Sequence, residues 1–182
     1  NSDVRKKIVI KGIIISSMYL AASCALKIYA LQKFEKALNS QSISYNDLIV
    51  KPTAMNTILW NGNVKTEHNY LIGDYSIFDS KPIEFYTIER NLELENQLAN
   101  NPDFEKLKQL SEGWYTVSEI EGTLIFNDLR FGILKDKNSN PQFVFSYEFI
   151  NVDGKLKAFE KIKEKRDGKA LLKNIWTRIQ GN

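Results

Sequence analysis

The chain has 182 residues, which is enough for one well-buried domain and short for two. A hydrophobic fraction of 43% excludes a disordered chain, and a net charge of +3 is too small to indicate nucleic acid as a partner. The single cysteine, Cys24, excludes an internal disulfide, and the single histidine, His68, cannot build a zinc site alone. Because the chain opens with Asn1 and not with Met, we expect it to have been processed or cut from a longer protein.

Residues 1–40 predict one long helix. Apolar positions recur every three or four residues from Met18 to Tyr29, and turn-forming residues follow Asn39. The uncharged run between Lys11 and Lys27 has 15 residues. Such a run covers about 22 Å of helix, which is shorter than the roughly 30 Å hydrocarbon core of a bilayer. Three interpretations stay open: a helix docked on the domain, the inner end of a transmembrane helix, and a helix at the membrane interface. The first two are compatible.

Residues 41–182 predict a single soluble domain. Period-two patterns separated by short turns predict strands over residues 56–67, 70–78, 83–89, 114–120, 123–131 and 143–150. Asn101 and Pro102 are typical of a helix start, so we expect a helix over residues 102–110, after a shorter helical turn at 91–99. Apolar spacing predicts a last amphipathic helix over residues 168–180.

These elements predict the α+β class, with a curved antiparallel sheet of about six strands and the N-terminal and C-terminal helices packed against it. The last strand places Phe143, Phe145, Tyr147 and Phe149 on one face, and we expect the long N-terminal helix to cover that face. A helix wrapped by a curved sheet is the layout of cystatin-like and nuclear-transport-factor-like folds, whose concave face often holds a pocket.

The strand over residues 123–131 contains an acid and a base in its interior. Side chains two residues apart share a face, so Asp128 and Arg130 lie on the same side, about 6–7 Å apart along the strand. An unpaired buried charge is costly, so we expect the two side chains to compensate each other. The pair is either a structural ion pair at the end of a sheet or the polar floor of a pocket, and both interpretations stay open.

The C-terminal part of the sequence is basic. Nine Lys or Arg residues stand against three Asp or Glu residues between Lys155 and Arg178. Such a run is typical of a solvated helix face, and it also suits attraction to an anionic lipid surface.

Several stretches together carry a family resemblance. They are KPTAMNTILW with Asn56 and Trp60, GDYSIFD with Tyr75, and then ERNLELE, LKQLSEGWYTV and NDLRFG. In this order they resemble the C-terminal portion of bacterial inner-membrane proteins classed as membrane-bound metal-dependent hydrolases, the family that includes LexA-binding membrane proteins. The resemblance covers residues 14–181, and the upstream segment up to Leu38 is similar to the end of the last membrane helix of that family.

The resemblance implies a division of labour. The metal-binding histidines and acids of the family lie in its N-terminal membrane portion, for which this sequence has no counterpart. We therefore expect an accessory extramembrane domain at the bacterial inner membrane, on a side that the sequence does not determine. The divalent metal and the hydrolase activity would belong to the longer parent protein, and this chain would hold no catalytic residue, metal ligand or cofactor. Its partners would be the membrane portion of the parent chain and anionic lipid.

The alternative hypothesis is a stand-alone module that binds a small ligand or a lipid headgroup on the concave face of the sheet. This hypothesis requires side chains from several strands to converge on one pocket. The candidate binding residues under either hypothesis are Asp128, Arg130, Tyr75, Trp60 and Asn56.

Overall fold

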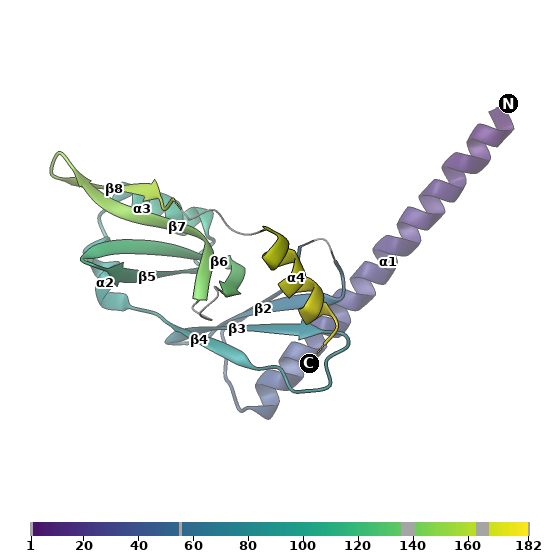
Figure 1. Ribbon diagram of the computed structural model, residues 1–182, viewed down its shortest axis with the longest axis horizontal. Helices are drawn as coiled ribbons and strands as arrows, with labels where there is room; N and C mark the ends of the chain where they lie inside the picture. Colours follow the sequence, from purple (N-terminus) through teal and green to yellow (C-terminus); the bar gives the residue numbers. More distant parts are fainter. Residues whose placement is uncertain (1, 55, 136–140, 163–167, 182) are drawn as a thin grey trace.

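The computed structural model describes residues 2–54, 56–135, 141–162 and 168–181 (Figure 1). Within these residues the helices are α1 (Ser2–Ser40), α2 (Leu92–Gln97), α3 (Pro102–Leu110) and α4 (Gly168–Ile179). The strands are β1 (Asp47–Pro52), β2 (Leu59–Lys65), β3 (Asn69–Ser76), β4 (Phe85–Glu89), β5 (Tyr115–Ile120), β6 (Thr123–Lys135), β7 (Pro141–Val152) and β8 (Lys155–Glu160).

The described strands form two antiparallel four-stranded sheets, β1-β2-β3-β4 and β5-β6-β7-β8. The predicted α+β class, the antiparallel pairing and both terminal helices are confirmed, whereas the prediction of one sheet of about six strands is wrong. The strands that the sequence pattern missed, β1 and β8, are short edge strands. Edge strands carry charged residues and proline, which weaken the period-two pattern by which strands are recognised.

The turn chemistry of the second sheet follows the sequence closely. Glu121 and Gly122 both have positive φ angles, of 51° and 77°, as the predicted two-residue hairpin between β5 and β6 requires. Asn101 caps α3 by accepting hydrogen bonds from the backbone N–H groups of Asp103 and Phe104, and Pro102 occupies the first turn.

Helix α3 covers the end of the aromatic face of β7 that carries Tyr147 and Phe149, a face that the sequence pattern assigned to the N-terminal helix. Phe104 is 2% exposed and meets Tyr115, Phe126 and Phe149 edge-on. The assignment to α1 is therefore wrong. The physical reason is proximity along the chain, because consecutive elements tend to pack together and α3 directly precedes β5.

The last turns of α1 pack on the first sheet. Phe34 is fully buried between Tyr75 and Phe85, with ring centroids 6.4 and 6.3 Å away. Its ring lies directly over Gly62 of β2, where any Cβ atom would overlap it. Ala30, Ala37 and Leu38 complete the buried face of this end of the helix.

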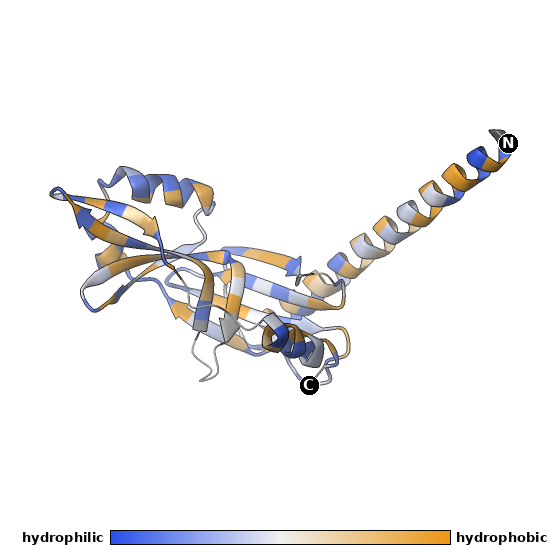
Figure 2. Cartoon of the chain, turned by 45° about the horizontal axis from the view of Figure 1, so that its top comes forward, coloured by the Kyte–Doolittle hydropathy of each residue, from blue (hydrophilic) through white to orange (hydrophobic). Residues whose placement is uncertain are grey.

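The preceding part of α1 projects from the domain (Figure 1). Apolar residues occur all around this part of the helix (Figure 2), and the large apolar side chains from Val4 to Leu20 are more than half exposed. These exposed residues include Val4, Ile8, Ile13, Ile14, Ile15, Met18, Tyr19 and Leu20. The helix is long and apolar enough to cross a membrane, and none of its most apolar 18-residue window is buried, unlike the core helix of a soluble protein. Docking on the domain thus describes only its C-terminal end.

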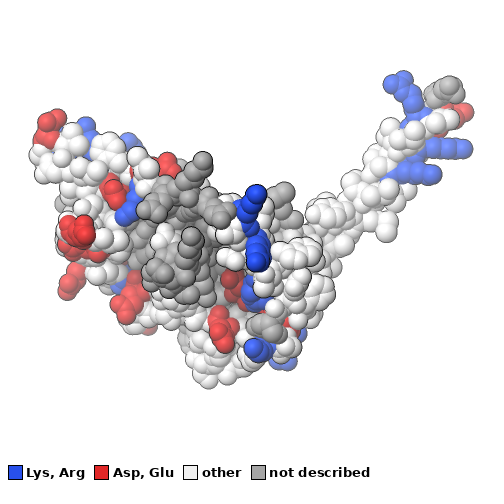
Figure 3. All heavy atoms as spheres, in the orientation of Figure 1, with Lys and Arg blue, Asp and Glu red and all other residues white. Residues whose placement is uncertain are grey.

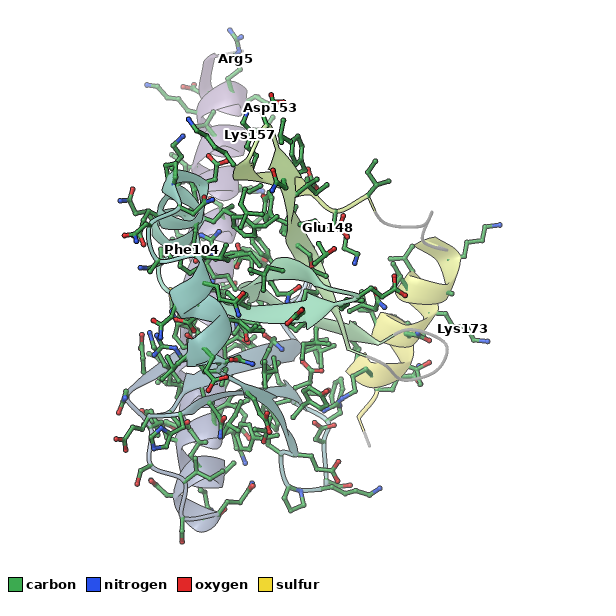
Figure 4. The ribbon with its side chains drawn as sticks, turned by 90° about the vertical axis from the view of Figure 1, so that its left-hand side faces the viewer. Arg5, Phe104, Glu148, Asp153, Lys157 and Lys173 are labelled. Carbon is green, nitrogen blue, oxygen red and sulfur yellow. The ribbon has the colours of Figure 1, made fainter. Side chains whose placement is uncertain are left out.

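Helix α4 packs on the opposite side of the first sheet from α1 (Figures 1 and 4). The Arg178 guanidinium donates hydrogen bonds to both carboxylate oxygens of Asp79 and to the backbone oxygen of Asp74. Ser76 donates to the backbone oxygen of Ile179 at 2.6 Å. The Asp79 side chain is 2% exposed, so this ion pair fixes α4 to the end of β3.

We expect Phe34→Ala to lower the free energy of unfolding by about 3–5 kcal/mol, because the substitution opens a cavity over Gly62 that the sheet cannot fill. Urea denaturation in detergent, followed by tryptophan fluorescence, measures the change. Met18→Ala is the matched control, since Met18 is 68% exposed on the same helix and should change the value by less than about 0.5 kcal/mol. Equal effects of the two substitutions would contradict this packing.

Candidate functional site

The sequence NDLRFG forms an irregular bend in β6. Asp128 pairs with Phe145 of β7 and Ile133 pairs with Phe143, so Leu129–Gly132 lie opposite a single residue, Val144. Extra residues in one strand bend it and turn side chains out of the regular alternation. Gly132 has a φ angle of 73°, and a Cβ atom there would come within 3.1 Å of the Asn61 side chain. The bend therefore requires glycine at this position.

Asp128 and Arg130 form the predicted ion pair across this bend. The Arg130 Nη2 atom donates to Asp128 Oδ2 at 2.7 Å, and Nε contacts both carboxylate oxygens at 3.2 Å. The carboxylate also accepts the backbone N–H of Arg130 at 2.9 Å. The hydrogen bonds that Arg130 donates to Asp128 raise the pKa of Arg130, and its Nη1 atom points to Glu112 at 3.4 Å. Two carboxylates therefore already surround the guanidinium, which leaves it poorly suited to bind an anionic ligand.

The bend also joins the two sheets. Leu129 is fully buried in a cluster with Tyr70, Ile72, Ile88 and Trp114, which belong to the first sheet and to the residue before β5. The Asn63 side chain of β2 donates to the backbone oxygen of Leu129 at 2.8 Å. The polar residues inside this strand thus shape a bend that carries Leu129 into the contact between the sheets.

The other candidate residues lie elsewhere. Trp60 and Tyr75 are cross-strand neighbours on β2 and β3, buried against Phe34 of α1. Burial and a hydrogen bond with Tyr29 raise the pKa of Tyr75. Asn56 shapes the turn before β2, because its Oδ1 atom accepts the N–H groups of Ile58 and Leu59 and its Nδ2 atom donates to Thr53 Oγ1. The structure therefore brings Trp60 and Tyr75 together, and Asp128 with Arg130, but does not bring the two pairs to one place.

A buried network that the sequence analysis did not single out surrounds Glu95 of α2. The Glu95 side chain is 8% exposed and accepts two hydrogen bonds from Arg90, at 2.9 and 3.0 Å. Tyr115 donates its hydroxyl to the same carboxylate at 3.0 Å, and burial raises the pKa of Tyr115. The sequence offered only a run of acids at a helix start, which ordinarily serves the helix dipole. The side chain that decides the role of Glu95 comes from β5.

Within the described parts of the chain, no group of three or more His, Cys, Asp or Glu side chains is arranged to hold a metal ion. Comparison with protein-family models, with curated proteins and with solved structures gives no match. The described carboxylates of Glu95, Asp128 and Asp79 are each engaged by an arginine, and the most prominent feature without a partner inside the domain is the projecting half of α1.

We expect Arg130→Met to lower the free energy of unfolding by about 3 kcal/mol, because Asp128 is only 6% exposed and would lose its charge partner. Adding Asp128→Asn should recover part of this loss, since the neutral amide can still accept the backbone hydrogen bond. Urea denaturation of the single and double variants measures both effects. A double variant no more stable than Arg130→Met would contradict a structural ion pair.

Buried Tyr115 makes stability depend on alkaline pH. A tyrosine ionises near pH 10 in the unfolded chain but keeps its proton in the fold, since its folded pKa is raised. The contribution of Tyr115 to the free energy of unfolding is therefore complete below about pH 10, and it decreases as the pH rises above that value. We expect Tyr115→Phe to cost about 1.5–3 kcal/mol at pH 8, from the lost bond to Glu95, and to show a smaller further loss up to pH 11. Tyr86→Phe, at an exposed position, should reproduce the wild-type profile.

Proposed function

We propose that this chain is the extramembrane accessory domain of a membrane-bound protein, with α1 as the end of a membrane helix that continues without a break into the domain. The observation that carries the proposal is the change of environment along one helix. The large apolar residues from Val4 to Leu20 are exposed, Leu26 packs partly against the first sheet, and Ala30 and Phe34 are fully buried. Exposed apolar side chains all around a helix are unfavourable in water and favourable in lipid.

The charges of α1 mark where a bilayer would end. Figure 3 shows basic side chains at the outer end of α1 and a stretch without charge between them and the domain. Lys11 and Lys27 bound the uncharged run of 15 residues. Lysine side chains reach several ångströms along a helix toward the lipid–water interface, which reduces the mismatch with a bilayer of about 30 Å.

The domain end of this run has an interfacial character. Tyr29 lies beside Tyr75 of β3, with ring centroids 6.4 Å apart, and the Lys33 ammonium lies 5.1 Å from the centre of the Tyr29 ring. Tyrosine and lysine are typical anchors at the level of lipid headgroups. Because the helix runs from Tyr29 into the packed core without a loop, the domain would be held at a fixed height above the bilayer.

The likeness to membrane-bound metal-dependent hydrolases supports a more specific form of the proposal. The parent protein would be a hydrolase of the bacterial inner membrane, with its divalent metal in a membrane portion outside this chain. This domain would steady or position that portion. Hydrolysis of generic ester or phosphodiester substrates should then require the parent protein, and metal-dependent turnover by this chain alone would contradict the accessory role.

No observation favours the alternative of a stand-alone ligand-binding module. That alternative needs Asp128, Arg130 and Tyr75 to converge on one pocket. Tyr75 packs on α1, whereas Asp128 and Arg130 lie at the bend of β6 in the other sheet.

The single native cysteine provides a direct test, because Cys24 is exposed on the projecting part of α1. After reconstitution into lipid vesicles, we expect a membrane-impermeant maleimide to leave Cys24 unlabelled, since bilayer lipid would surround it. The control combines Cys24→Ser with Asn39→Cys. Position 39 is exposed to water at the C-terminal end of α1, where the helix packs on the domain. Its thiol should react in every molecule whose domain faces the outside of the vesicle. Equal labelling of both positions would contradict the proposal.

A further inference from the structure

The outer face of α4 combines apolar and basic residues. Leu172 and Trp176 are 64% and 63% exposed, and they lie one helical turn apart on the same flank. Lys169 and Lys173 follow the same spacing on the neighbouring flank, and Lys173 points away from the sheet (Figure 4). The flank with Leu171, Ile175 and Arg178 is partly buried, and it holds the helix to the domain through the ion pair of Arg178 with Asp79.

This helix is attached close to the point where α1 leaves the domain. Tyr29 of α1 contacts Tyr75, the next residue Ser76 donates to the backbone oxygen of Ile179, and Ile179 ends α4. Helix α4 also runs across the direction of α1, since Figure 2 shows α4 nearly end-on and α1 along its length. A helix in this position would lie roughly parallel to the surface of a bilayer that α1 crosses.

The composition of α4 fits a lipid surface with negative charge. It has three basic residues, Lys169, Lys173 and Arg178, and no acidic residue. Arg178 is neutralised by Asp79, so the two lysines supply the charge of the outer face. Tryptophan prefers the headgroup level of a membrane, and each lysine near an anionic surface strengthens attraction about fivefold. Amphipathic helices that lie in the interface combine these same features.

We propose that α4 is an interfacial helix that rests on the same bilayer that α1 enters, with Leu172 and Trp176 among the headgroups and Lys169 and Lys173 beside anionic lipids. This inference depends on the proposed function, because α1 must first bring the domain to the membrane. Contact through two elements, α1 and α4, fixes the tilt of the domain as well as its height. The ion pair between Arg178 and Asp79 then transmits this orientation to β3.

Fluorescence quenching by lipids with a brominated acyl chain tests the proposal on the full chain in vesicles. The chain has three tryptophans, of which Trp60 and Trp114 are 2% and 3% exposed. We expect quenching in vesicles that contain phosphatidylglycerol, and we expect it to disappear in Trp176→Phe. Lys173→Glu should weaken quenching severalfold in anionic vesicles and leave it unchanged in phosphatidylcholine alone. Lys157→Glu, with the same change of charge on exposed β8, is the matched control and should quench as the wild type does.

Parallel labelling of Cys24 separates the two proposals. Protected Cys24 with no quenching of Trp176 would overturn the role of α4 and leave α1 as a membrane helix. Reactive Cys24 would overturn the membrane anchor itself. A shift of Trp176 emission that depends on protein concentration and not on lipid would also overturn the inference, because it would assign the face of α4 to contact between protein molecules.

Discussion

The contact between Phe34 and Gly62 fixes the relation between the long helix and the domain. Phe34 fills the space that a side chain on β2 would otherwise occupy, and it is held between Tyr75 and Phe85. Because α1 is one continuous helix, this contact also sets the direction in which its exposed half projects. The proposed position of the domain above a bilayer, and the placement of α4 near that bilayer, both depend on this packing.

The bend in β6 has a comparable role within the domain. Its acid and base are in the strand because the bend needs a local charge pair and a carboxylate that accepts a backbone N–H. In return, Leu129 reaches the cluster that links the two sheets. The bend thus explains why Asp128 and Arg130 occur in a buried strand. A structural role is sufficient for both residues, without any role in binding or catalysis.

The sequence predicted those parts of the fold that depend on local signals. Asn101 and Pro102 predicted the start of α3, and Glu121 and Gly122 predicted the hairpin between β5 and β6. Both predictions were possible because helix capping and tight turns depend on only a few consecutive residues. The pairing of Asp128 with Arg130 was also predictable, because two residues on one strand share a face.

Long-range features were not predictable in this way. The contact between the two sheets depends on Asn63 and Leu129, which are 66 residues apart, and the role of Glu95 depends on Tyr115. No local period reports such contacts. The cover of β7 was assigned to the longer helix, although α3 is closer along the chain and places Phe104 among the aromatic residues of the sheet. Hydrophobic pattern indicates that a face must be covered, but not by which element.

A spin-label scan along α1 in lipid vesicles tests the central claim most directly. One label at a time, from Gly12 to Leu38, would be measured for its accessibility to oxygen and to a water-soluble nickel complex. We expect contact with lipid at every position as far as Ala22, followed by a helical period with protection at Leu26, Ala30, Phe34 and Leu38. Access of the nickel complex to the whole segment, or a break in the helical period between Leu26 and Ala30, would contradict it.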